Sequence, residues 1–499
     1  MDLYLGGGVL IKKLSILVLC LICLLTGCTI EISIPDIKLP SNDNTSTPND
    51  NETNEKPNED SSENDNTSND DIKEPIVEKI SYFGSDNDVY RINIETDNGN
   101  LPTSTSTYLN ATFNITEQDI TKVLNDTSNI QIRVRGNSTS APDKKPYKLK
   151  FKEGTSLFGL KKAKDWVLLA NYFDKSNVRN YLAYTLANKI DNLNFQPSSI
   201  FIDLYINSKY QGLYMLCEQI EANNGRVDIE NHYNSDGVSS FLLEVDDRAK
   251  DEFNGYKNKC YFTLGEYDIA FKYPSANDYI SAFNTNDNVF LEQYIKDSKW
   301  AISFFTDALA ILKSNNFDEF SKYFDIESFI NYYFIQEFFK NVDVSSTSQF
   351  YVIDQADETV KIKCGPVWDF DISAGVVDDS QNSVYTTYAK TELYVKQVDM
   401  FYRLMFNNRK FNQKVSEKYN EIRPLILETF DELTNIKNAL TKAQNRNQIR
   451  WKFPIERKYW IEVNAMSIEY FNLENIEGHY DYLESFLNER LILLDKYYL

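Results

Sequence analysis

The chain has 499 residues, a formal net charge of −22 and only two histidines. An acidic excess of this size argues against general nucleic-acid binding, and two histidines leave almost no material for Ser-His-Asp hydrolysis, Cys-His catalysis or histidine-rich zinc sites. Any catalysis must therefore use carboxylates, lysines and arginines.

The first 28 residues have the pattern of a bacterial lipoprotein signal peptide. Lys12 and Lys13 precede a short apolar run over 14–25, and the sequence LTGC ends at Cys28. A basic region, a short apolar region and small residues at the cut are typical of a signal peptide, and the run is short for a membrane span. We expect diacylglycerol on Cys28 and an extracytoplasmic, membrane-anchored location. The alternative is a plain secretory signal.

Residues 29–75 follow as an acidic segment rich in Asn, Asp, Ser and Thr. They carry 13 acidic and 3 basic side chains and too few apolar residues to offset the entropy cost of ordering. We expect a disordered linker. Cleavage and lipidation would leave three cysteines in the remainder, which allow at most one disulfide bond: Cys217, Cys260 and Cys364.

The remainder, 76–499, predicts an α+β fold. Residues 89–95 and 108–115 alternate apolar with polar side chains, which is the strand period, and long stretches with apolar spacings of three and four follow about residue 290. The expected architecture is a β-rich lobe over about 76–285 and a mainly helical lobe over about 286–499.

A hairpin with a cationic face is predicted within the first lobe. Residues 130–135 and 147–151 place apolar side chains on one face and four cations on the other: Arg133, Arg135, Lys148 and Lys150. Cations and a loop at Gly136 and Asn137 suit phosphate groups, although a basic strand face is usually only solvated.

Two further elements complete this lobe. Residues 165–172 lead into a helix that Asp174 or Ser176 would cap, and 200–217 form a second hairpin. Glu218, at its end, either anchors a phosphate-binding lysine, lies at the edge of a nucleotide, or is an ordinary surface glutamate.

The stretch from Ile326 to Gly375 carries the chemistry. It opens as a helix that is apolar almost all round and ends near Lys340 or Asn341, and two short strands follow at 349–353 and 360–364. A hairpin returns the chain to its starting point, so carboxylates before and after it come close together.

Asp343 stands just before this hairpin, and Asp369 and Asp371 stand just after it. Clustered carboxylates favour a hard cation such as Mg²⁺. The order of helix, Asp, hairpin and Asp is that of a protein kinase's catalytic and metal loops. Any one of these residues alone would more often cap a turn or pair with a lysine; the ordered set favours phosphate transfer.

Several motifs, in order, resemble the CotH family of spore-coat and cell-surface proteins. They are RGNST with KKPYKLKF, DWVLLANYFDKSNVRNYLAYTLA, GLYMLCEQIE, FLLEVD and GPVWDFD, and the similarity runs from about residue 85 to the end. The resemblance implies an atypical, secretory-type protein kinase fold that uses ATP and Mg²⁺ or Mn²⁺ to phosphorylate serine on exported proteins.

By position in these motifs, the resemblance implies a role for each candidate residue. Asp343 would be the catalytic aspartate, with Asp369 and Asp371 as metal ligands. The ATP-binding candidates are Arg135, Asn137, Lys145, Lys148 and Glu218, and the essential lysine stays open. Ser348 stands where a kinase has its second metal-binding Asn, so the second metal ligand is open too.

The leading hypothesis is therefore Ser/Thr phosphorylation of exported or surface proteins, such as those of a spore coat. A surface scaffold or adhesion module with the same fold and no turnover is the alternative; it would not be stabilised by ATP and metal. Carbohydrate hydrolysis by paired carboxylates is a weaker third option, because no spacing singles out such a pair.

Overall fold

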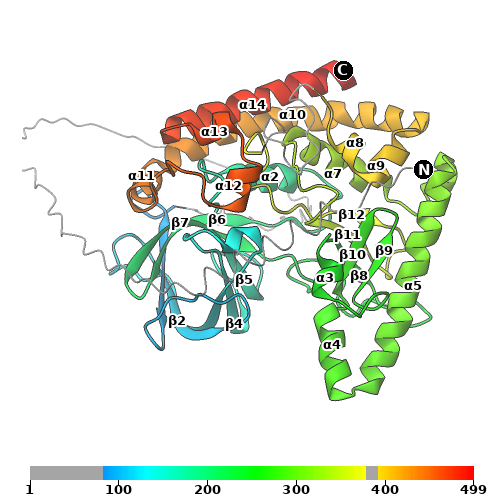
Figure 1. Ribbon diagram of the computed structural model, residues 1–499, viewed down its shortest axis with the longest axis horizontal. Coiled ribbons are helices and arrows are strands. Elements are labelled where there is room, and N and C mark those ends of the chain that lie inside the picture. Colours follow the sequence, from blue (N-terminus) through cyan, green and yellow to red (C-terminus); the bar gives the residue numbers. More distant parts are fainter. Residues whose placement is uncertain (1–82, 378–391) are drawn as a thin grey trace, which may run out of the picture. The chain divides into compact units, whose positions relative to one another are not determined.

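The computed structural model describes residues 83–377 and 392–499, all of which belong to one compact unit, Val77–Leu499 (Figure 1). The predicted signal peptide, Cys28 and the acidic linker lie outside the described residues. None of the described helices combines the length and the apolar character that a membrane crossing requires.

Seven strands of the N-terminal part close into a barrel in the order β1-β2-β3-β4-β5-β7-β6. The strands are β1 (Tyr90–Thr96), β2 (Leu109–Thr116), β3 (Ser128–Val134), β4 (Tyr147–Thr155), β5 (Ala163–Leu169), β6 (Ser199–Ile206) and β7 (Lys209–Glu218). Neighbours pair antiparallel except at the closure, where β1 runs parallel to β6. Alternate residues such as Ile130 and Ile132 fill the interior at no more than 3% exposure, which confirms the predicted hairpins.

The cationic face of the β3–β4 hairpin exists, but it is partly neutralised. Arg133 lies opposite Lys148 in the strand register. Lys148 in turn forms a 2.8 Å ion pair with Asp165 of β5. The neighbouring strand therefore supplies a carboxylate to a face that looked purely basic in the sequence of the hairpin.

A second, antiparallel sheet has the order β12-β11-β8-β10-β9. Its strands are β8 (Phe241–Val245), β9 (Tyr261–Leu264), β10 (Tyr267–Tyr273), β11 (Gln349–Ile353) and β12 (Lys363–Cys364). The predicted hairpin at 349–364 forms, with a shorter second strand than expected, and β11 also pairs with β8. The sheet thus takes strands from both sides of the lobe boundary expected near residue 285.

Helices dominate the C-terminal part, as predicted. They are α2 (Arg179–Asn188), α3 (Ala249–Glu252), α4 (Ala276–Thr285), α5 (Asn288–Lys313), α6 (Phe317–Phe320), α7 (Ile326–Phe338), α8 (Val395–Val398), α9 (Met400–Met405), α10 (Arg409–Ala439), α11 (Thr441–Arg450), α12 (Trp460–Asn464), α13 (Ile468–Phe471) and α14 (Ile476–Tyr498), with a short 3-10 turn at Ser138–Ser140. Helix α7 is buried at every residue from 328 to 338 and packs against α10 and α14.

Two hydrophobic cores result. One fills the barrel, and the other is shared by the second sheet and the helices. The three cysteines of the described chain are buried and free, so they form no disulfide bond.

The loop before α2 differs from the prediction. Val178 occupies the N-cap position of α2, and no side chain caps it there. Asp174 lies outside the helix but accepts the backbone N–H of Arg179 at 2.8 Å, and it also binds the Ser176 hydroxyl at 2.5 Å. Asp174 therefore accepts a backbone N–H that would otherwise be unpaired at the start of the helix, although it is not the N-cap residue.

His479 of α14 provides a stability prediction. Its ring is 1% exposed and packs on Phe453 and Tyr470, with centroids 4.8 and 4.7 Å away. Burial, reinforced by the positive charges of Arg179 and Lys175, lowers the pKa of His479 to about 3. The folded protein therefore keeps this imidazole neutral at any pH near neutrality.

Between about pH 3 and 6.5, the unfolded chain binds a proton at His479 that the folded chain does not bind. The free energy of unfolding should therefore fall as pH falls through this range, by up to about 1.4 kcal/mol per pH unit from this residue. In urea denaturation at pH 4.5 to 7, His479→Phe should lose that part of the slope. His232→Gln, which removes the other histidine, should keep it; an unchanged slope in His479→Phe contradicts the prediction.

Candidate active site

The β11–β12 hairpin brings the three predicted aspartates into one place. Asp343 lies in the loop between α7 and β11, and Asp369 and Asp371 lie in the loop after β12. Asp343 and Asp371 are buried, at 7% and 6% exposure, and Asp369 is half-buried. Antiparallel pairing of Tyr351 with Cys364 closes the hairpin that joins the two loops.

Asn341 connects the two loops directly. Its side-chain oxygen accepts the backbone N–H of Asp343 at 3.2 Å, and its side-chain nitrogen donates to the carbonyl of Asp369 at 3.2 Å. One buried amide therefore sets the spacing between the predicted catalytic residue and the predicted metal ligand.

Asp369 is held in a left-handed backbone conformation with φ of +65°. Its N–H donates to the Tyr184 hydroxyl at 3.4 Å, and its carboxylate accepts the Ser348 hydroxyl at 3.3 Å. Ser348 is itself left-handed, with φ of +57°. Non-glycine residues of this kind are uncommon and gather at functional sites, because the surrounding structure must impose them.

The electrostatics of the cluster are those of crowded carboxylates. Burial raises the pKa of Asp371 well above its ordinary value, and the negative charges of Asp369, Asp343 and Asp174 raise it further. Like charges at close range cannot all ionise at low cost. A cation bound among these carboxylates would relieve that repulsion.

Arg179 braces the loop that carries Asp369 and Asp371. Its guanidinium donates to the carbonyls of Ser373 and Ala374 at 3.1 and 3.0 Å and to the Asp174 carboxylate at 2.6 Å. We did not select Arg179 or Asp174 from the sequence as site residues. One feature of the sequence could have identified Arg179: it is an arginine in the first turn of a helix, where the helix dipole disfavours a cation unless a specific partner is present.

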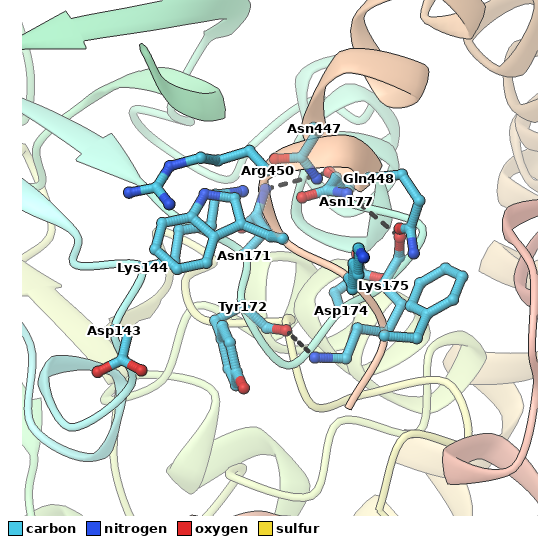
Figure 2. Close-up of a pocket in the computed structure, with 13 residues that line it drawn as sticks. Asp143, Lys144, Asn171, Tyr172, Asp174, Lys175, Asn177, Asn447, Gln448 and Arg450 are labelled. Carbon is cyan, nitrogen blue, oxygen red and sulfur yellow. Dashed lines mark hydrogen bonds between the residues drawn. The ribbon is translucent and has the colours of Figure 1, made fainter. Parts of the chain in front are cut away.

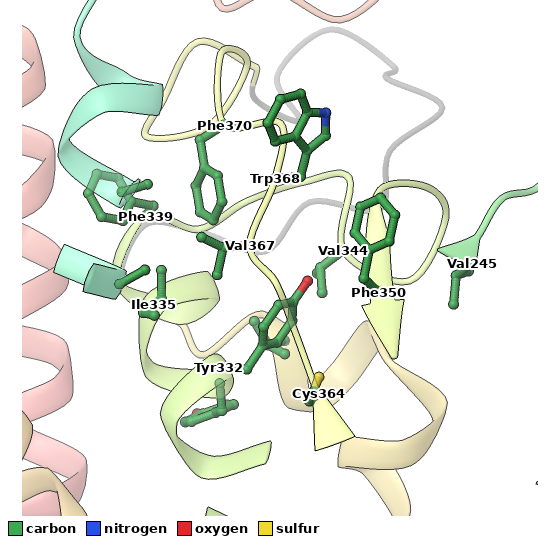
Figure 3. Close-up of a cluster of buried hydrophobic side chains, with 14 of the residues drawn as sticks. Val245, Tyr332, Ile335, Phe339, Val344, Phe350, Cys364, Val367, Trp368 and Phe370 are labelled. Atoms are coloured by element: carbon green, nitrogen blue, oxygen red, sulfur yellow. The ribbon is translucent and has the colours of Figure 1, made fainter. Parts of the chain in front are cut away.

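Aromatic rings pack against the same loop at two positions, Trp368 and Phe370. Phe370 packs edge-on against Phe339 with centroids 5.6 Å apart, and Trp368 stacks on Tyr184 at 5.7 Å. Figure 3 shows Phe370 facing Phe339, with Val367 beside them and Trp368 turned toward the opposite side of the loop. These ring contacts hold the backbone on both sides of Asp369.

Among the candidate ATP-binding residues, Arg135 contacts the segment that carries Asp369 and Asp371. Its guanidinium lies 5.7 Å from the centre of the Trp368 ring. Trp368 is the residue immediately before Asp369. Lys148 pairs with Asp165, and Asn137 is exposed at the start of the short turn after β3.

Lys145 and Glu218 have local partners. Lys145 donates to the carbonyls of Ser140 and Ala141 in its own loop, at 2.7 and 3.1 Å. Glu218 is 4% exposed, so it is not a surface residue, and its ion pair at 2.6 Å is with an arginine, Arg226, rather than with a lysine. Of the alternatives for Glu218, the surface position is excluded, and the ion-pair partner seen in the structure is an arginine.

The aspartates of the site suit a divalent cation that takes few ligands from the protein. Within 83–377 and 392–499, no three His, Cys, Asp or Glu side chains form a group that would hold a metal by themselves. Mg²⁺ does not need such a cage, because it is usually held by one or two carboxylates together with phosphate oxygens and water. Asp369 and Asp371, with the Ser348 hydroxyl adjacent, match that smaller requirement.

Comparison with known proteins now adds to this geometry. Residues 132–494 match the family model described as CotH kinase protein. The chain belongs to this family. The matched range covers most of this chain and includes Asp343, Asp369 and Asp371. No curated protein matches the sequence. Membership associates the protein with spore coats and with kinase activity at the level of the family.

Proposed function

We propose that this protein is an atypical Ser/Thr protein kinase that uses ATP and Mg²⁺ or Mn²⁺ to phosphorylate exported or surface proteins, with a kinase-like arrangement of its two lobes. The observation that carries the proposal is the meeting of Asp343 with Asp369 and Asp371 across one hairpin, tied by Asn341. A lipid on Cys28 would hold the enzyme at the outer face of the membrane.

In this proposal each aspartate has a separate task. Asp343 orients the acceptor hydroxyl and accepts its proton through a carboxylate oxygen. Asp369 and Asp371 would hold the cation, which would supply positive charge for the transferred phosphate. Because metal ligands must be deprotonated, Asp371 would have to lose the proton that its crowded surroundings favour.

The basic residues would serve the phosphates of ATP. Arg135 supplies a guanidinium beside Trp368. In protein kinases the phosphate-binding lysine is held by an acidic partner, and Lys148 has such a partner in Asp165. Of the candidate lysines, Lys148 therefore suits this role better than Lys145, which is engaged within its own loop.

The direct test is transfer of labelled phosphate from ATP to a Ser-rich acceptor by the purified protein, with Mg²⁺ or Mn²⁺. We expect incorporation that requires the metal and stops with a chelator. Absence of incorporation, together with no thermal stabilisation by ATP and metal, would instead favour the non-catalytic scaffold.

Ser348 gives a prediction about the metal. Asn tolerates the left-handed backbone found at this position better than Ser does and adds an amide oxygen as a ligand. We expect Ser348→Asn to lower the metal concentration for half-maximal thermal stabilisation by ATP several-fold, and Ser348→Ala to raise it. Identical metal titrations for all three proteins would place Ser348 outside the metal site.

A further inference from the structure

A small polar pocket lies beside the candidate active site. It has a volume of about 210 Å³ and is formed by three segments: the end of the β3–β4 loop, the loop before α2, and the C-terminal end of α11 with the residues after it (Figure 2). Four cations line it: Lys144, Lys175, Arg450 and Lys452.

The cations of this pocket form no ion pairs within the described residues, although the carboxylates of Asp174 and Glu462 lie near enough to Lys175 to act on its pKa. Both carboxylates of the lining, by contrast, form ion pairs. Asp174 pairs with Arg179 at 2.6 Å, and Asp143 pairs with Lys458 at 3.4 Å. The lining therefore has an excess of positive charge.

Lys144 is buried and Lys175 is half-buried. Lys144 is 3% exposed, and its ammonium donates to the carbonyl of Leu213 at 2.7 Å. Lys175 donates to the carbonyl of Tyr172 at 2.8 Å, as drawn in Figure 2. Burial, and then the positive charge of Lys175, lowers the pKa of Lys144 to about 7. Since like charges raise each other's energy at close range, an anion between them would stabilise both.

The size and chemistry of the pocket indicate its ligand. Lysine and arginine donors with amides such as Asn171 and Asn447 are the groups that recognise phosphate. The cavity has room for one phosphate group and the side chain that carries it.

Asp174 connects the pocket to the aspartates. Its carboxylate lines the pocket and binds Arg179, which in turn holds the carbonyls of Ser373 and Ala374. These carbonyls lie two and three residues beyond Asp371. A peptide bound at the pocket would therefore lie next to the loop that carries the metal ligands.

We propose that this pocket binds the phosphate of a phosphoserine already present on the acceptor protein, so that the enzyme favours serines near an earlier phosphorylation. The proposal rests on the proposed function for the identity of the acceptor. The binding itself requires no catalysis, so it can be measured on an inactive protein.

The test compares two synthetic peptides of identical sequence, one with Ser and one with phosphoserine, by calorimetry on the Asp369→Asn protein. We expect the phosphopeptide to bind at least tenfold more tightly. Arg450→Gln/Lys452→Gln in the same protein removes two exposed cations of the pocket and should weaken phosphopeptide binding at least tenfold, which corresponds to about 1.4 kcal/mol.

The matched control is Lys299→Gln/Lys414→Gln, which makes the same change in charge at two exposed lysines away from the pocket. It should leave phosphopeptide binding unchanged. Equal affinity for the two peptides, or equal weakening by both double variants, overturns the proposal.

Two competitors distinguish the possible sources of the phosphate. Saturating ATP with Mg²⁺, added to the protein with an intact Asp369, should leave phosphopeptide binding in place; competition would assign the pocket to the nucleotide and overturn the proposal. Inorganic phosphate should compete only weakly. Tight binding of inorganic phosphate without preference for the phosphopeptide would identify a free-anion site instead. If the kinase assay fails and phosphopeptide binding persists, the proposed function fails and the binding site stands.

Discussion

Asp369→Asn is expected to abolish phosphate transfer, and Asp343→Asn to slow it by about 10²–10⁴-fold, the usual contribution of a positioned acid or base. The first change removes a charged ligand from the cation. The second leaves a side chain that accepts no proton from the acceptor hydroxyl. Both replacements keep the shape of the side chain, so the loss should be chemical and not structural.

Thermal melting separates a chemical cause of the lost activity from a structural one. Asp369 and Asp343 both raise the pKa of buried Asp371 through their charge, so removing either charge relieves repulsion. We expect each variant to melt at the same temperature as the parent or slightly above it. Asp431→Asn, at an exposed position of α10, should keep full activity. Lost activity with a lowered melting temperature would indicate a structural role, and retained activity would overturn the proposed function.

Arg490→Met is expected to lower the free energy of unfolding by about 3–5 kcal/mol, the range for removing one partner of a buried ion pair. Arg490 of α14 and Glu337 of α7 are both fully buried and joined. The guanidinium also donates to the carbonyl of Glu392 at 2.7 Å, and the Glu337 carboxylate accepts the backbone N–H groups of Tyr394 and Val395 at 2.6 and 2.8 Å.

Chemical denaturation measures this effect. Lys322→Met removes the exposed ion pair with Glu319 and should cost less than about 1 kcal/mol, as exposed pairs do. A similar cost for both variants would contradict the prediction. Because α7 ends just before Asp343, the Arg490→Met protein should also lose activity at temperatures where the parent is stable.

The sequence predicted the parts of the site that depend on local pattern. The short apolar run at 349–353 predicts a strand. A hairpin necessarily brings its two ends together, so the approach of Asp343 and Asp369 followed from the chain order alone. The continuous apolar character of α7 likewise predicts its burial, because a helix apolar on every side has no face for water.

The remainder depends on contacts between distant segments. Arg179 meets the carbonyl of Ala374 across 195 positions, and no local period encodes that pairing. Arg226 as the partner of Glu218 was not predicted for a related reason: it is only eight positions away, but a loop without regular structure brings it back. The parallel closure of the barrel by β1 and β6 is also long-range and leaves no signature in either strand.

The buried, unpaired thiols have a consequence for how this protein can be made. Burial raises the pKa of Cys260 to about 12 and those of Cys217 and Cys364 well above their ordinary values. Thiols that stay protonated and covered react slowly with oxidants and with other thiols, because the thiolate is the reactive form. A chain whose sequence predicts export would therefore mature in an oxidising compartment without a disulfide-forming catalyst, and its folded form should be indifferent to reducing agents.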